Sequence, residues 1–302
     1  MSATAFVLGL DFGSTTGKAV VLDEFGAIRG AAVSTAATMS DLGVREAMAD
    51  ALRQAGIEES EVARAVATGY GRRMLDIADR TITEITCHAR GAVHLVPAAR
   101  LVVDIGGQDS KVIAIDDNGL VASFHMNDRC AAGTGKFLET LATALDVELE
   151  QMGPLALEAT EDVQISAMCA TFASTEVISL LAEGRNRIDL LGGVHAAVAR
   201  RTSGMIARVG VREPVVMTGG VARNPAVVEH LERELGIRLV LPEQPQVAGA
   251  LGAALFALDD LRTEGSRRPV DDETHDPAVE RSGGACAPAC PANNLITLET
   301  RR

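Results

Sequence analysis

Aromatic residues and positive charge are both scarce in this sequence of 302 residues. Tryptophan is absent, tyrosine occurs once and aromatic residues make up 3% of the chain, which argues against base-stacking platforms for nucleic acid. Lysine and arginine number 28 against 41 aspartate and glutamate residues, and the formal net charge is -13. A broad basic face for nucleic acid or for an anionic membrane is therefore not expected. Any phosphate ligand must be held by local geometry.

Long apolar runs are also missing, since no stretch approaches the roughly 20 residues that span a bilayer. The start of the sequence, MSATAFVLGLDFG, lacks the basic region and longer apolar stretch of a signal peptide, so we expect a cytoplasmic protein. Cysteine occurs five times, an odd number that speaks against a fully paired disulfide framework. In a reducing compartment these cysteines are better candidates for metal ligation or packing.

Two similar strand–turn–strand units stand in the two halves of the chain. Short apolar runs at residues 5–11 and 18–23 flank the turn FGSTTG, and runs at 101–104 and 111–116 flank the turn IGGQDS. Each unit has an aspartate at the end of its first strand. The repetition predicts a duplicated α/β fold with one domain in each half.

The other expected elements complete these two domains. Helices are expected near 41–55, before Pro97, from about Gly135, after Cys169, from near Ala226 and over 246–262, and strands at 62–68 and 215–218. We expect residues 1–97 with the returning helix 246–262 to form the first domain, and residues 98–245 to form the second. Residues 263–302 lack apolar periodicity and predict a disordered tail.

The turns DFGSTTGK and DIGGQDSK combine glycines, which let backbone amides approach a ligand, with small hydroxyl residues that bind phosphate oxygens. Neither turn is a P-loop or a G-x-G-x-x-G fingerprint. One glycine-rich turn alone is more often merely a turn, but two copies led by Asp11 and Asp104 favour a nucleotide site, in which the two carboxylates hold Mg²⁺ through its waters. The residues expected at the phosphates are Gly13, Ser14, Thr15, Thr16, Lys18, Gly106 and Gly107.

Together with the string TGGVARN, these turns resemble the actin, Hsp70 and sugar-kinase superfamily, whose RNase H-like domains bind ATP in a cleft between them. The resemblance implies that Gln108 or a neighbour orients the attacking water. It also implies further nucleotide contacts at Gly133, Thr134 and Gly135. The contacts to the nucleoside are expected at Gly219, Gly220 and Asn224.

Two cysteines stand directly before predicted helices. Cys130 occurs in NDRCAAGTGKFLE and Cys169 in SAMCATFASTEVISLLAEG, so each thiolate is expected to face helix N-terminal amides, a setting that lowers a thiol pKa and favours an anionic ligand such as an iron–sulfur cluster. A single cysteine is more often a small buried hydrophobe, but two in the same setting carry more weight. Cys87, beside His88 in TCHARGA, is expected to be packed without a chemical role.

The chain to about residue 262 resembles the BadF/BadG/BcrA/BcrD/HgdC-type ATPases, which are activators of 2-hydroxyacyl-CoA dehydratases and ATPase subunits of benzoyl-CoA reductase. The motifs that carry the resemblance are LGLDFGSTTGKAVV, ATGYGRR, EITCHARGA, VVDIGGQDSKVI, NDRCAAGTGKFLE, FASTEVISLLAEG, VVMTGGVARN and GALGAALFA. The resemblance implies a 4Fe-4S cluster shared across a dimer, with Cys130 and Cys169 of each subunit as ligands. Two thiolates per chain are also half of the four that such a cluster takes.

The same resemblance implies the partners. These are a second copy or a sister ATPase subunit across the cluster, a CoA-thioester-reducing enzyme, and ferredoxin or flavodoxin as electron donor. The motifs do not distinguish a reductase subunit from a dehydratase activator, a homodimer from a heterodimer, or one acyl-CoA substrate from another.

Other functions stay open at this point. A small-molecule kinase of the same superfamily predicts phosphoryl transfer by a protein without a cluster, and a regulatory ATP-binding module predicts nucleotide affinity without electron flow. Cys286 and Cys290 form a C-x-x-x-C-P string that resembles the end of a bacterial ferredoxin motif, but the preceding C-x-x-C-x-x-C part is missing. The role of these two cysteines is open.

Overall fold

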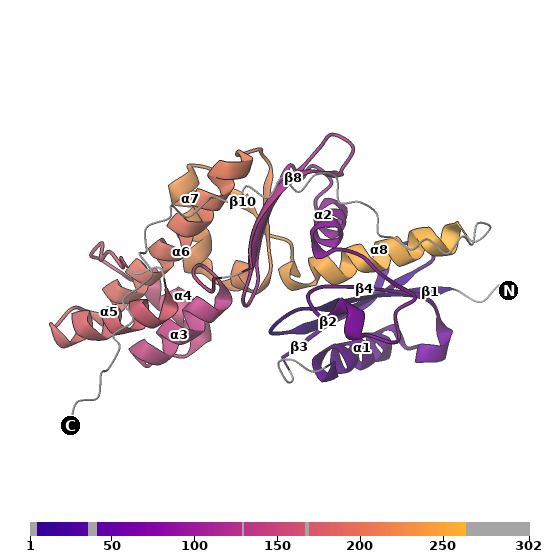
Figure 1. Cartoon of the computed structure of the whole chain (residues 1–302), viewed down its shortest axis with the longest axis horizontal. Coiled ribbons are helices and arrows are strands. Elements are labelled where there is room, and N and C mark those ends of the chain that lie inside the picture. Colours follow the sequence, from indigo (N-terminus) through magenta and orange to yellow (C-terminus); the bar gives the residue numbers. More distant parts are fainter. Residues whose placement is uncertain (1–4, 36–40, 129, 167–168, 264–302) are drawn as a thin grey trace, which may run out of the picture. The chain divides into compact units, whose positions relative to one another are not determined.

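The computed structural model describes residues 5–35, 41–128, 130–166 and 169–263. The strands of this part form two five-stranded sheets (Figure 1). The first sheet has the order β3-β2-β1-β4-β5 and contains β1 Phe6–Phe12, β2 Gly17–Asp23, β3 Ile28–Ser34, β4 Val62–Thr68 and β5 Arg80–Thr81. The second has the order β10-β9-β6-β7-β8 and contains β6 Leu101–Ile105, β7 Ser110–Ile115, β8 Val121–Asn127, β9 Val215–Thr218 and β10 Leu239–Val240. The predicted tail, with Cys286 and Cys290, lies outside the described residues.

The two sheets have the same topology. In each sheet the first three strands form an antiparallel meander, and the fourth strand pairs in parallel with the first. The fifth strand then adds in parallel to the fourth. The duplicated α/β fold predicted from the two hairpins is therefore confirmed. The third strands, β3 and β8, were not expected, because their many exposed positions weaken the apolar signal.

Helices alternate with these strands. They are α1 Leu42–Ala55, α2 Glu84–Leu95, α3 Gly135–Leu145, α4 Leu149–Ala156, α5 Ala170–Ala182, α6 Arg187–Val209, α7 Pro225–Leu235 and α8 Ala248–Arg262, with short 3-10 turns η1 Glu59–Glu61, η2 Arg72–Met74, η3 Gly220–Arg223 and η4 Pro245–Val247. The helix starts expected at Gly135 and after Cys169 are confirmed. Within the described residues, no helix combines the length and the apolar character needed to cross a membrane.

Helices cover both faces of the first sheet because side chains along a strand alternate between the faces. On β1, Val7 packs with Leu251 and its neighbours on α8, whereas Leu8 and Leu10 pack with Val44 and its neighbours on α1. In Figure 1 the long helix α8 runs along β1 and β4. Both faces are thus buried, and β1 can carry a nearly continuous apolar run up to Asp11.

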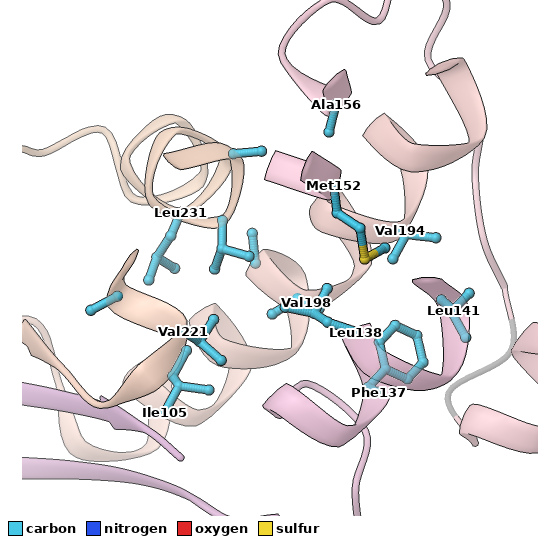
Figure 2. Packing of buried hydrophobic residues seen from close by; sticks show 14 of the residues in the cluster. Ile105, Phe137, Leu138, Leu141, Met152, Ala156, Val194, Val198, Val221 and Leu231 are labelled. Carbon is cyan, nitrogen blue, oxygen red and sulfur yellow. The ribbon is translucent and has the colours of Figure 1, made fainter. Parts of the chain in front are cut away.

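The second sheet is covered in the same way. Ile113 and its neighbours on one face pack with Ala89 and others on α2, and the opposite face packs with α3, α4, α6 and α7. Figure 2 shows part of this larger core, in which Met152 of α4 lies beside Val194 of α6. The core holds the long helix α6 firmly against the sheet.

Helices α2 and α8 cross in direct backbone contact (Figure 1). A Cβ atom on Gly91 of α2 would lie 1.9 Å from the carbonyl oxygen of Ala248, and one on Gly252 of α8 would lie 1.8 Å from that of Cys87. Real side chains cannot fit at these distances. The two glycines therefore permit the close crossing of α2 and α8.

Candidate functional site: two matched aspartate edges

Asp11 lies on β1 between two polar residues of the neighbouring strands. It pairs in register with Lys18 on β2 and with Thr68 on β4. Lys18 Nζ is 3.2 Å from Asp11 Oδ2, and the carboxylate is almost fully buried. Burying a charge is costly unless it is paired, and Lys18 supplies the pairing cation for Asp11.

Asp104 has the same neighbours in the second sheet. It pairs in register with Lys111 on β7 and with Thr218 on β9. The Thr218 hydroxyl donates to Asp104 Oδ1 at 2.8 Å, and Lys111 Nζ is 3.4 Å from Asp104 Oδ2. The sequence prediction included Lys18 but not Lys111, although each lysine follows its aspartate by the same interval.

A glycine with positive φ follows the threonine in both sheets. Gly69 follows Thr68 with φ 89°, and Gly219 follows Thr218 with φ 87°. A Cβ atom on Gly69 would lie 2.4 Å from Asp11 Oδ1, and one on Gly219 would lie 2.3 Å from the carbonyl oxygen of Ile105. Both positions demand glycine for its conformation and its size.

The two predicted phosphate turns face each other. A Cβ atom on Gly107 would lie 2.0 Å from Thr15 Oγ1, so the glycine of the second turn lies directly against the threonine of the first. Ser14, Thr15 and Thr16 are partly exposed, and Gln108 is exposed at the tip of its turn. The small size of Gly107 is what lets the turns approach this closely.

The start of α3 supports the second turn from behind. The amides of Gly135 and Lys136 donate to the carbonyls of Gly106 and Gly107 at 2.9 and 2.7 Å. Thr134 is buried and donates its hydroxyl to Ala131, and the Gly133 carbonyl accepts from the Ser110 hydroxyl at 3.3 Å. In this structure these helix amides hold the turn rather than pointing freely at a ligand.

The string TGGVARN continues from β9 into η3 and α7. The Gly219 amide donates to Pro245, and Gly220 begins η3. Asn224 is the N-cap of α7: its side-chain oxygen accepts from the amides of Ala226 and Val227, and its nitrogen lies 3.0 Å from His195 Nε2. The side chain of Asn224 is therefore already engaged by protein groups.

His88 of α2 joins the two aspartate edges, a role that the sequence did not reveal. His88 Nδ1 is 3.2 Å from Asp104 Oδ1, an ion-pair distance that falls outside hydrogen-bond geometry. A Cβ atom on Gly249 would lie 2.9 Å from His88 Nε2 and 3.1 Å from Asp11 Oδ2, so the imidazole and the Asp11 carboxylate both border this glycine. Only tertiary packing of α2 against α8 creates this arrangement.

Charges in this network hold one another ionised. Burial by itself raises the pKa of Asp104, but the charges of His88 and Lys111 and the Thr218 hydroxyl bring it well below its usual range. Burial also lowers the pKa of Lys111, which Asp104, Asp109 and Glu84 raise above its ordinary value. The pKa of His88 is lowered by burial and raised, on balance, by Asp104. Asp104 thus offers anionic oxygen atoms at neutral pH, the kind of group that Mg²⁺ prefers.

The two candidate ligand cysteines lie before α3 and α5. Cys169 is the N-cap of α5 and is exposed, and the amides of Thr171 and Phe172 lower the pKa of its thiol. Cys130 is partly exposed, and its carbonyl accepts from the Asn127 side chain at 2.8 Å. Cys87 is fully buried, and burial raises the pKa of its thiol to about 12. Cys130 and Cys169 therefore have the exposure that metal ligands need, and Cys87 does not.

The donor set of one chain is incomplete for a four-ligand cluster. Among the described residues, no three side chains of His, Cys, Asp or Glu gather in a geometry that could hold a metal ion. Two thiols with one of them acidified fit half of a 4Fe-4S ligand set, so a complete set needs donors from elsewhere. Thiolates are suitable ligands for such a cluster, and two thiolates per chain fit a cluster that is shared with another chain.

Comparison with known proteins agrees with this geometry. The model of the BadF/BadG/BcrA/BcrD ATPase family matches residues 8–257. The chain is 44% identical to the activator of lactoyl-CoA dehydratase from Anaerotignum propionicum over 84% of this chain and 98% of that protein. It is 34% identical to a benzoyl-CoA reductase subunit from Thauera aromatica over 70% of this chain and 77% of that protein.

Solved structures show the same fold. The crystal structure of component A of (R)-2-hydroxyglutaryl-CoA dehydratase from Acidaminococcus fermentans superimposes with a TM-score of 0.82 at 40% identity, covering 85% of this chain and 99% of that one. A glucokinase of the ROK family from Streptomyces griseus superimposes with a TM-score of 0.53 at 14% identity, covering 84% of this chain and 100% of that one. The second likeness extends to the fold alone.

Proposed function

The chain belongs to the BadF/BadG/BcrA/BcrD ATPase family, and on that basis we propose that it hydrolyses ATP to drive low-potential electrons into an enzyme that reduces CoA thioesters. The observation that carries the ATPase part is the matched pair of Asp–Lys–Thr edges with their turns in contact at Thr15 and Gly107. The names of the relatives, activators of 2-hydroxyacyl-CoA dehydratases and a benzoyl-CoA reductase subunit, support the partner.

In this proposal the two aspartates bind Mg-ATP through the metal. Asp11 and Asp104 would hold Mg²⁺ through its waters, and Lys18 and Lys111 form ion pairs with these two buried carboxylates. The glycine-rich turns bind the phosphates with their backbone amides, and Gln108, exposed at the tip of the second turn, orients the attacking water. When the γ-phosphate is lost, the two turns no longer share it as a ligand, and the contact between them at Thr15 and Gly107 changes.

The two proposed domains correspond to the two sheets. We propose that residues 1–97 with α8 form one ATPase domain and residues 98–245 form the other, which carries the cysteines. Cys130 and Cys169 bind one half of a 4Fe-4S cluster, and a second copy or a sister subunit binds the other half. The cluster, when bound, supplies a one-electron carrier of low potential. Ferredoxin or flavodoxin is the proposed donor, and the protein is proposed to act in the cytoplasm.

The experiment that tests this function is anaerobic purification followed by iron analysis, electron paramagnetic resonance and ATPase assay. We expect iron and a cluster signal in the dimer, and loss of both in the Cys130→Ser/Cys169→Ser double variant. A Cys87→Ala variant is the matched control, because Cys87 is fully buried and should leave the iron content unchanged.

Two further variants separate the remaining alternatives. Replacing Cys286 and Cys290 with serine should leave the iron content unchanged, and iron loss in that variant would contradict the ligand assignment. Asp104→Asn should abolish ATP hydrolysis while the iron remains. Undiminished turnover in that variant would exclude the proposed metal site, and phosphoryl transfer to an added sugar by an iron-free protein would favour the kinase.

A further inference from the structure

A cavity of about 510 Å³ lies between α6, β8 and the segments next to the two candidate ligand cysteines. Arg200, Arg201 and Arg208 of α6 line one side. Gly133, three residues after Cys130, and Ser166, three residues before Cys169, line the other. None of these residues belongs to the aspartate edges that are proposed to hold magnesium, and Gly133 is the one among them that is also expected to contact the nucleotide.

Helix α6 presents its arginines to the cavity as a fixed stripe. Ala197, Arg201, Met205 and Arg208 recur at intervals of three or four residues, which places them on one face of the helix. Other residues of α6, among them Val194 and Val198 in Figure 2, are buried in the core of the second sheet. The helix cannot turn without opening this core, so the stripe is held in place.

Within the part of the chain that the structure describes, the arginines of this cavity have no carboxylate partner. Among the described residues no carboxylate forms an ion pair with Arg200, Arg201 or Arg208, although the chain carries a formal net charge of -13. Arg201 Nε is buried and has no hydrogen-bond partner among the residues that the structure describes. A buried, unpaired guanidinium nitrogen costs free energy unless a ligand accepts from it.

Neighbouring residues contact the side chains of both Arg201 and Arg208. Gly133, with φ 78°, packs against the stem of Arg201, where a Cβ atom would lie 2.9 Å from Arg201 Cγ. Arg208 Nη1 lies 3.2 Å from His125 Nε2. Burial, followed by the charges of Arg208 and Arg201, lowers the pKa of His125, so this histidine adds no positive charge at neutral pH and can accept from Arg208.

The remaining cavity wall combines apolar side chains with the polar side chains of Gln164 and Ser166. Phe137, Ile165 and Met205 line it beside the arginines. The volume is in the range of sites for organic ligands and is larger than a bare phosphate ion needs. A ligand with one strongly anionic end and a small apolar body would use both parts of the wall.

We propose that this cavity binds a phosphate ester, with the phosphate at Arg201 and Arg208 and the organic part against Phe137 and Ile165. Guanidinium groups bind phosphate oxygens through paired N–H donors, and Arg201 Nε lacks an acceptor within the described ranges of the chain. A bound ester would tie together the segment that follows Cys130 and the segment that precedes Cys169.

Isothermal titration calorimetry on the full chain tests the proposal with phenyl phosphate, inorganic phosphate and citrate as probes. Saturating Mg-ADP is present throughout, so that the phosphate turns are occupied. We expect phenyl phosphate to bind more tightly than inorganic phosphate, because only the ester has an organic body, and citrate to bind more weakly than phenyl phosphate. Tighter binding of citrate, or no binding of either phosphate probe, would overturn the assignment.

Arginine variants locate the binding. Arg201→Gln and the exposed Arg208→Gln should each weaken phenyl phosphate binding by at least roughly tenfold, since each removes a charge-assisted hydrogen bond. Arg212→Gln, an exposed arginine outside the cavity, is the matched control and should leave binding unchanged. Asp11→Asn should also leave it unchanged, which separates this site from the proposed ATP site. Equal weakening by Arg212→Gln, or undisturbed binding in a folded Arg208→Gln protein, would exclude the cavity as the site.

Discussion

The ammonium group of Lys111 lies 3.4 Å from the carboxylate of Asp104, and both side chains are 3% exposed. Lys111 also lies 2.6 Å from Asp109 and 3.5 Å from Glu84, so one buried cation serves three carboxylates. The corresponding pair in the first sheet, Lys18 and Asp11, is 14% and 5% exposed. The second edge of the candidate site is therefore the more buried and the more highly charged of the two.

Replacing Lys111 with methionine should destabilise the protein strongly. The substitution keeps most of the volume but leaves Asp104 and its neighbours without their buried partner, a change that typically costs about 3–5 kcal/mol. Urea unfolding measures the loss. Lys136→Met, which removes an exposed pair with Glu139, should change the free energy of unfolding by less than about 1 kcal/mol. Equal losses in the two variants would show that burial of Lys111 is not what matters.

A methyl group on Gly107 should separate the two phosphate turns. Because its Cβ atom would lie 2.0 Å from Thr15 Oγ1, Gly107→Ala forces one turn away and should lower kcat/KM for ATP by on the order of 100-fold. The same substitution should cost clearly less in a Thr15→Gly background, which lacks both the hydroxyl and the Cβ atom that would lie 2.7 Å away. Steady-state kinetics on the four proteins of this double-mutant cycle provide the check. Additive effects would mean that the turns do not meet in the working enzyme.

Acid should destabilise the fold through His195. Burial lowers the pKa of this histidine to about 4, and its Nδ1 donates to the Leu191 carbonyl at 2.7 Å. Between pH 6.5 and 4, this histidine binds a proton in the unfolded chain but not in the folded chain. The free energy of unfolding therefore falls as the pH falls through this window, by roughly 2 kcal/mol at pH 5.

His195→Gln should remove this contribution. The urea midpoint measured at pH 7 and at pH 5 should then shift less in the variant than in the original protein. Between pH 7 and 8, where the histidine is neutral in both states, the two proteins should show the same pH dependence. A full-sized acid shift in the variant would assign the effect to other groups.

Cys169 should be the faster of two thiols to react in iron-free protein. The amides of Thr171 and Phe172 lower the pKa of the exposed Cys169 thiol, whereas burial raises that of Cys87 to about 12. Since the thiolate is the nucleophile, iodoacetamide near pH 7.5 should modify Cys169 first, which peptide mass spectrometry measures. In denaturant the two thiols should react alike. Faster labelling of Cys87 in the folded protein would contradict the assigned helix N-cap.

The sequence by itself determined those features that depend on neighbouring residues. Apolar runs, the glycine-rich turns and the aspartates at the strand ends are local patterns, so both hairpins and the duplicated fold followed from them. The helix start after Cys169 was predicted for the same reason, because a change from a polar segment to an apolar helical pattern is visible in one stretch of chain.

Only the tertiary structure decided which distant residues meet. His88 reaches Asp104 because Gly91 and Gly252 let α2 and α8 touch, and no local pattern contains that crossing. In the sequence Arg201 resembles any surface residue of a long helix, and only the packing of α6 places it in a cavity beside Gly133, where its Nε has no hydrogen-bond partner among the described residues. Burial and charge pairing between segments far apart in the chain depend on packing in three dimensions, which the order of residues along one segment does not contain. The sequence shows the two matched aspartates, but only the folded protein pairs them with cations. Likewise, only the fold places the arginines of α6 in a cavity.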